Sequence, residues 1–170
     1  MDRRSLLMLG LLAPVAATRT ARGQSTLAPP TGRVILTING RIRSRNSDDA
    51  AVFDRAMLEA LGTERFTTAT PWHEGPQSFE GVPMARLLRH VGAEGETITV
   101  TALNDYRTEI PVADFERFGT ILALKRQGEY MPVRDRGPLF IVYPYDSRPE
   151  LQARLYYSRS AWQVATITVS

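Results

Sequence analysis

The sequence predicts an α+β fold with mixed β-sheets and about three short helices. Strands are indicated by alternating apolar residues, most clearly in Thr97–Ala102, where Ile98, Val100 and Ala102 share one side. Segments with helical spacing are few and short. They do not alternate regularly with the strands, which argues against repeated β–α–β units and favours an α+β arrangement.

The first half of the chain is predicted to hold two strands and two helices. Val34–Ile38 alternates before Asn39-Gly40, which predicts a strand entering a hairpin turn. Ser47–Leu61 is predicted as a helix capped by Ser47-Asp48-Asp49 and stopped by Gly62, Phe66–Trp72 as a strand followed by a loop, and Pro83–Gly92 as a second helix. The apolar residues that share one side of a helix are Phe53, Met57, Leu58 and Leu61 in the first and Met84, Leu87, Leu88 and Val91 in the second.

The second half begins with the strand Thr97–Ala102 and a turn at Asn104-Asp105, whose side chains can bond to nearby backbone. Ala113–Phe118 is predicted as a short helix, Ile121–Leu124 as a strand and Leu139–Tyr143 as a central strand because it is apolar throughout. The remaining predictions are a short helix or irregular structure at Glu150–Tyr157, and a last strand with Ala165, Ile167 and Val169 on one side.

Residues 1–23 have the organisation of a signal peptide, with Arg3-Arg4, an apolar stretch at Leu6–Ala17 and small residues before Gln24. The paired arginines also fit a twin-arginine signal, so the Sec and Tat routes both stay open. Residues 24–32 are predicted to be a flexible linker and residues 33–170 one domain. We therefore expect export to the periplasm, with no membrane insertion after cleavage.

Composition excludes several classes of protein. The full chain has 21 Lys and Arg against 18 Asp and Glu, but without residues 1–23 the count is 17 of each. The mature chain thus lacks the basic footprint of a nucleic-acid binder. It has no cysteine, which excludes thiolate catalysis, iron–sulfur clusters and Cys-ligated zinc.

A set of short segments stands in a fixed order along the chain: Thr70–Trp72, Phe79–Leu88 (FEGVPMARLL), Ala102–Tyr106, Ile121–Leu124, Gly137–Pro144 and Trp162. Together they resemble the molybdopterin-binding domain of the sulfite oxidase family in its short, exported bacterial form. The resemblance covers roughly residues 33–169 and implies the sulfite oxidase-like fold, with molybdopterin as a possible cofactor and oxygen-atom transfer as the family's chemistry.

In that family one Cys thiolate and the pterin dithiolene hold the molybdenum, and the resemblance places the Cys-bearing segment at Phe66–Thr70. Threonines stand there instead, and Pro71-Trp72 replaces the usual Asn/Gly-rich turn. A threonine hydroxyl is a hard donor that stays protonated at neutral pH, whereas molybdenum here takes a soft thiolate. We therefore predict no protein ligand to a metal.

Candidate site residues fall into two groups. His73 and Glu74 are the only neighbouring pair suited to proton transfer, although an exposed loop turn is the favoured explanation for them. Arginines and tyrosines could hold an anionic or pterin-like ligand, because guanidinium groups match phosphate and carboxylate, and surface ion pairs are the competing explanation. These ligand-binding candidates are Asp105, Tyr106, Arg107, Arg134, Arg136, Tyr145 and Arg159.

Three functions remain open at this point. The first is a non-catalytic, exported protein that binds a small molecule or a periplasmic partner, such as a membrane sensor. The second is a molybdopterin-dependent oxidoreductase that uses an oxygen ligand, or none, in place of the thiolate. The third is an accessory subunit of an exported redox complex.

Overall fold

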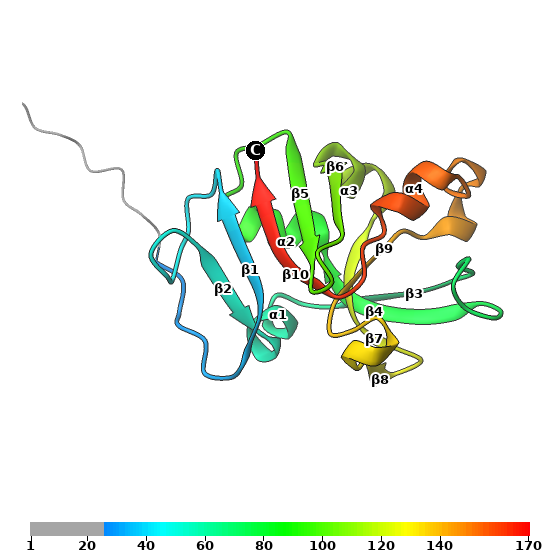
Figure 1. Ribbon diagram of the computed structural model, residues 1–170, viewed down its shortest axis with the longest axis horizontal. Helices are drawn as coiled ribbons and strands as arrows, with labels where there is room; N and C mark the ends of the chain where they lie inside the picture. Colours follow the sequence, from blue (N-terminus) through cyan, green and yellow to red (C-terminus); the bar gives the residue numbers. More distant parts are fainter. Residues whose placement is uncertain (1–25) are drawn as a thin grey trace, which may run out of the picture.

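The computed structural model describes residues 26–170, which form two β-sheets and four short helices (Figure 1). The first sheet has the spatial order β2 (Ala51–Asp54), β1 (Val34–Gly40), β10 (Val164–Val169), β5 (Thr97–Ala102) and β6 (Arg107–Pro111). The second has the order β3 (Glu64–Thr68), β4 (Gln77–Pro83), β7 (Ile121–Arg126) and β8 (Glu129–Tyr130), with β9 (Phe140–Val142) also paired to β7. The predicted α+β class with mixed sheets is confirmed.

The helices are α1 (Arg55–Ala60), α2 (Met84–His90), α3 (Ala113–Phe118) and α4 (Arg154–Arg159). Three single 3₁₀ turns follow β8 and β9: η1 (Val133–Asp135), η2 (Tyr145–Ser147) and η3 (Pro149–Leu151). No helix among residues 26–170 is long and apolar enough to cross a membrane. The predicted signal peptide, residues 1–23, lies outside the described residues, as does the start of the predicted linker.

The best-patterned segments fold as the sequence predicts. In β5, Ile98 and Val100 are fully buried and alternate with half-buried threonines, so its two sides differ as expected. In α2, Met84, Leu87 and Leu88 are buried, and Gly92 follows with a positive φ of 62°. The turn after β5 is an Asx turn, since Asn104 Oδ1 accepts a hydrogen bond from the Tyr106 N–H at 3.2 Å.

The predicted helix Ser47–Leu61 is wrong in its first half. Ala51–Asp54 forms the edge strand β2, with Ala51 and Phe53 buried, and only then does α1 begin. The N-cap is Asp54, whose Oδ1 accepts from the Met57 N–H at 2.9 Å, and not the predicted Ser47–Asp49. Phe53 would reach the core from a helix or from a strand, so its apolar character does not distinguish the two. Antiparallel pairing with β1 makes this segment a strand.

The predicted hairpin at Asn39-Gly40 is also wrong. β1 pairs in parallel with β10, at the C-terminal end of the chain. On its other side it pairs with β2, but a ten-residue loop connects the two strands in place of a tight turn. The last strand places Ile167 and Val169 in the core as predicted, but Ala165 is half-buried. A bulge between Val164 and Thr166 shifts the register and gives the core position to Val164.

Two further segments differ from expectation in their surroundings. β9 is fully buried but is not a central strand: it pairs with β7 and, on its other side, bonds only at Ala161 and Trp162.

Residues 26–32 make specific contacts, including Leu27 N–H to Arg45 O at 3.0 Å and Gly32 N–H to Asp54 Oδ2 at 2.7 Å. Their assignment as a linker stays a prediction.

Candidate functional site

The segment where the resemblance places a metal ligand, Phe66–Thr70, includes the end of β3 and two buried threonines, Thr68 and Thr70. Thr68 has no exposed surface. Its Oγ1 accepts a hydrogen bond from the Asp146 N–H at 3.1 Å and donates to Ala69 O at 3.3 Å. Asp146 Oδ2 in turn accepts from the Ala69 N–H at 2.6 Å, so β3 and η2 are joined by two crossing hydrogen bonds.

Thr70 and His73 form a second polar contact in the following turn. Thr70 Oγ1 lies 2.7 Å from His73 Nδ1, and Arg136 Nη1 lies 3.3 Å from His73 Nε2. An arginine can only donate, so Nε2 must accept and the ring hydrogen sits on Nδ1, from which it is donated to Thr70. Both ring nitrogens of His73 are therefore occupied within the protein.

The electrostatics keep His73 neutral. Burial has the largest effect and lowers the pKa of the ring, and the positive charges of Arg126 and Arg136 lower it further. The negative charge of Asp135 opposes these effects, and the resulting pKa is about 4. Asp135 forms an ion pair with Arg126. A neutral imidazole that accepts from one neighbour and donates to another acts as a connector between the β3–β4 turn and η1.

Trp72 lies in the same turn and packs edge-on against four other rings. Its centroid is 5.4 Å from Trp162, 5.6 Å from Phe140, 6.0 Å from Tyr157 and 6.4 Å from Tyr145. Edge-to-face pairs at this spacing are favourable beyond the apolar area that they bury. The rings come from β9, η2, α4 and the start of the last strand, so Trp72 joins four segments that are distant in sequence.

Beside this cluster is a small cavity of about 230 Å³ with mostly apolar walls. Trp72, Tyr157 and Trp162 supply the aromatic surface, and Asn104, Tyr106 and Arg154 add polar groups. Tyr106 is fixed there because its hydroxyl donates to Ser158 O at 2.6 Å. A narrow space with aromatic walls and few polar groups suits a small, flat ligand.

The structure brings some of the predicted site residues together and separates others. His73 and Arg136 are in contact, and the Arg136 guanidinium lies 5.6 Å from the Trp162 ring centre. Tyr106 lines the cavity. Tyr145 is buried, bonded to Ser160, and burial raises the pKa of its hydroxyl.

The other predicted residues lie elsewhere. Arg159 is bound to Asp114 at 2.7 Å and is not directed at a ligand site. Asp105, Arg107 and Arg134 are exposed, and Glu74 is exposed in the turn after His73. Their roles in binding or proton transfer stay predictions.

Sequence reasoning did not select the two tryptophans of the cavity, Trp72 and Trp162, as site residues. Trp72 and Trp162 are separated by ninety positions, and no periodic signal links them. The one available signal was their position in the segments that carry the family resemblance.

One mixed sheet, one antiparallel sheet, the turn after β3 and an aromatic cavity beside it define a cofactor-domain fold, with threonines in the segment where the resemblance places the metal-ligating Cys. The sequence model of the oxidoreductase molybdopterin binding domain family matches residues 54–146, more than half of the chain, and the chain belongs to that family. A search for similar sequences among curated proteins found no match.

The residues present do not fit molybdenum in the way that the family resemblance implies. The chain has no thiolate, and the Thr68 hydroxyl is buried and engaged on both its donor and its acceptor side. Among residues 26–170, no three His, Cys, Asp or Glu side chains are grouped to hold a metal ion. The hydroxyl keeps one lone pair beyond these two bonds, but a neutral alcohol oxygen is a hard, weak donor and does not replace a soft thiolate.

Proposed function

We propose that this chain is an exported, non-catalytic member of the molybdopterin-binding oxidoreductase family that binds a small planar anion in the cavity beside Trp72. The observation that supports the proposal is the engagement of Thr68, the fully buried threonine of the segment where the resemblance places the metal-ligating Cys. Fold membership by itself does not establish catalysis.

The chemistry of the ligand follows from the cavity walls. Trp72, Tyr157 and Trp162 offer ring surface for stacking, and Arg154 supplies the charged group that lines the cavity. Arg154 has no ion-pair partner among residues 26–170, so an incoming carboxylate or phosphate would not have to displace a bound acid. A pterin or another flat heterocycle with an acidic group meets these requirements.

Metal analysis of the protein from cells competent for molybdenum cofactor synthesis tests the non-catalytic part. We expect molybdenum far below one atom per chain and no reduction of an oxo-donor. About one molybdenum per chain with turnover would instead support the oxidoreductase hypothesis. Mass spectrometry of extracted small molecules in the same sample would report any pterin held without metal.

Ligand binding is tested separately with pterin-6-carboxylate as the probe and quenching of tryptophan fluorescence as the readout. Arg154→Gln should weaken binding by about 5-fold, the loss of roughly 1 kcal/mol from one exposed charge contact. Arg89→Gln, an exposed arginine on α2, is the matched control. Equal affinity of both variants would remove the assigned role of Arg154, and no binding by the wild type would remove the proposed ligand class.

The proposal that the chain is exported depends only on the predicted signal peptide, residues 1–23. Replacing Arg3-Arg4 by two lysines should block passage through the twin-arginine route and leave the general secretory route working. Fractionation of cells that express either form distinguishes the two routes. Cytoplasmic retention of the unmodified chain would contradict export.

A further inference from the structure

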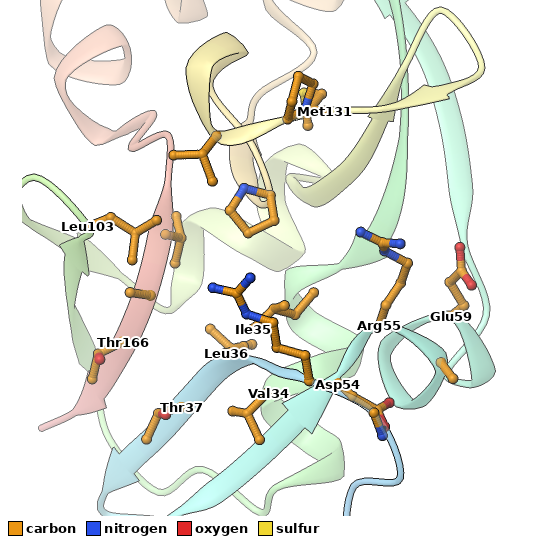
Figure 2. Close-up of a pocket in the computed structure, with 18 of the residues that line it drawn as sticks. Val34, Ile35, Leu36, Thr37, Asp54, Arg55, Glu59, Leu103, Met131 and Thr166 are labelled. Atoms are coloured by element: carbon orange, nitrogen blue, oxygen red, sulfur yellow. The ribbon is translucent and has the colours of Figure 1, made fainter.

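A second site is suggested by the way in which β1 and β10 separate. Their parallel pairing runs only from Thr37 with Thr166 to Gly40 with Val169. Before Thr37, residues Val34–Leu36 pair with β2 alone, and each diverging strand has a register shift at this point, around Ile35 and around Ala165. Figure 2 shows the two strands diverging around an open groove, which encloses about 840 Å³.

The divergence leaves strand edges without a partner. Val34–Leu36 makes no ladder on its β10 side, and no other strand among residues 26–170 fills that position. Unpaired strand edges are ready templates for another extended chain. In peptide recognition by strand addition, main-chain hydrogen bonds give affinity and side-chain pockets give selectivity.

The walls of the groove are unusually apolar for exposed surface. Val34, Leu103 and Val133 all line it, with exposed fractions of 41%, 55% and 49%. They are half of the six large hydrophobic residues that are exposed among residues 26–170. Exposed apolar groups gathered in one concavity are typical of an interaction site, whereas scattered ones are not.

Two arginines give the groove a positive character. Arg33 and Arg55 line it without an ion-pair partner in the described part of the chain, and Figure 2 shows Arg55 directed into the opening. The Arg55 guanidinium is held 4.1 Å above the Tyr130 ring.

The two carboxylates of the groove are already engaged. Asp54 accepts from the backbone N–H groups of Gly32 and Met57, which lower its pKa, and Glu59 accepts from the Tyr130 hydroxyl at 2.7 Å. The two guanidinium groups are therefore available to an incoming acid.

We propose that this groove binds an extended segment of a partner protein in which an acidic residue lies next to β-branched or other apolar residues. The segment adds a strand along Val34 and Ile35, which are partly exposed, whereas Leu36 is fully buried. It places its apolar side chains against Leu103 and Val133 and sets its carboxylate between Arg33 and Arg55. The groove shares no lining residue with the aromatic cavity, so the two sites can be tested independently.

Selection from phage-displayed random dodecapeptides on the intact protein tests this site. We expect enriched peptides to combine an acidic residue with β-branched neighbours, and to protect the amides of Val34 and Ile35 from hydrogen exchange when they bind. The double variant Arg33→Gln/Arg55→Gln should weaken a fluorescein-labelled enriched peptide by about tenfold, since one exposed charge contact is worth up to about fivefold. Added salt should weaken binding to the wild type more than to the variant.

The double variant Arg89→Gln/Arg107→Gln removes two exposed arginines outside the groove and should bind as the wild type does. All four arginines are exposed, so circular dichroism should report folded protein in each case. Failure to enrich any peptide, equal binding by the two double variants, or protection elsewhere in the chain would overturn the proposal. A dimer in solution that dissociates in the Arg33→Gln/Arg55→Gln variant would assign the groove to a second copy instead.

Discussion

Asp146 donates its backbone N–H to the hydroxyl of Thr68 over 3.1 Å, across 78 positions of sequence. Together with the bond from Ala69 N–H to Asp146 Oδ2, this contact fixes the end of β3 to η2. The resemblance places the family's metal-ligating Cys in the segment Phe66–Thr70, and in this protein Thr68 of that segment joins two parts of the fold.

Thr68→Val should destabilise the protein by about 1–2 kcal/mol, because the substitution leaves the Asp146 N–H without its acceptor. Urea unfolding followed by circular dichroism measures the change. Thr67→Val, at the exposed neighbouring position, is the matched control and should shift stability by less than about 0.5 kcal/mol. Equal effects of the two variants would contradict a structural role for the Thr68 hydroxyl.

Stability should fall as the pH drops from about 6.5 to about 4, because of His73. Its pKa is lowered from 6.5 to about 4 in the fold, so the unfolded chain binds a proton in this window that the folded chain does not. The expected loss is about 2 kcal/mol, less than the full shift implies, because the ring is partly exposed. His73→Gln should flatten this part of the profile, measured by urea unfolding at several pH values.

The second histidine gives a matched control for that experiment. His90→Gln, on the exposed side of α2, leaves His73 in place and should keep the slope between pH 6.5 and 4. A profile that is unchanged in His73→Gln would show that other groups cause the acid sensitivity.

Arg159→Met should cost about 3 kcal/mol of stability. Arg159 Nη1 bonds to Asp114 Oδ2 at 2.7 Å, and within residues 26–170 the only other side chain bonded to that buried carboxylate is Tyr143, through its hydroxyl at 3.0 Å. Removing the guanidinium leaves a buried negative charge without its counter-charge. Arg154→Met, in the same helix but exposed, should change the thermal midpoint little. A small effect at Arg159 would reopen its predicted role in ligand binding.

Gly81→Ala should cost about 3 kcal/mol or more, because a Cβ there would lie 2.1 Å from the Leu122 carbonyl oxygen in the neighbouring strand. Gly75→Ala separates this effect from backbone strain. Gly75 has a φ of 67° but nothing within 4 Å of its Cβ position, so its substitution should cost only about 1–2 kcal/mol. The yield of folded protein and chemical denaturation measure the stability of both variants. If both lose the same stability, the steric contact with Leu122 is not the cause of the effect at Gly81.

The sequence predicted the parts of the fold whose signals are local. β5 and α2 formed as expected because the alternation of Thr97–Ala102 and the spacing of Met84, Leu87 and Leu88 each fit one kind of element. Ser47–Leu61 was ambiguous, since Phe53 could reach the core from a helix or a strand. Pairing with β1, a contact between separate segments, made it β2.

The candidate site was less predictable for the same reason. His73 and Arg136 were selected on residue type, and the fold brings them into contact. Arg159 was selected on the same ground, and the fold directs it to Asp114. Residue type tells what a side chain can bind, and only its neighbours in space decide what it does bind.

By itself the sequence determined the class of fold, the family segments and the absence of a cysteine thiolate, since these depend on residue identity and short-range spacing. The tertiary structure alone decided that Thr68 is bonded to Asp146, that Trp72 meets Trp162, and that β1 and β10 diverge to open a groove. Each of these depends on contacts between residues far apart in the chain, and local patterns carry no information about such contacts.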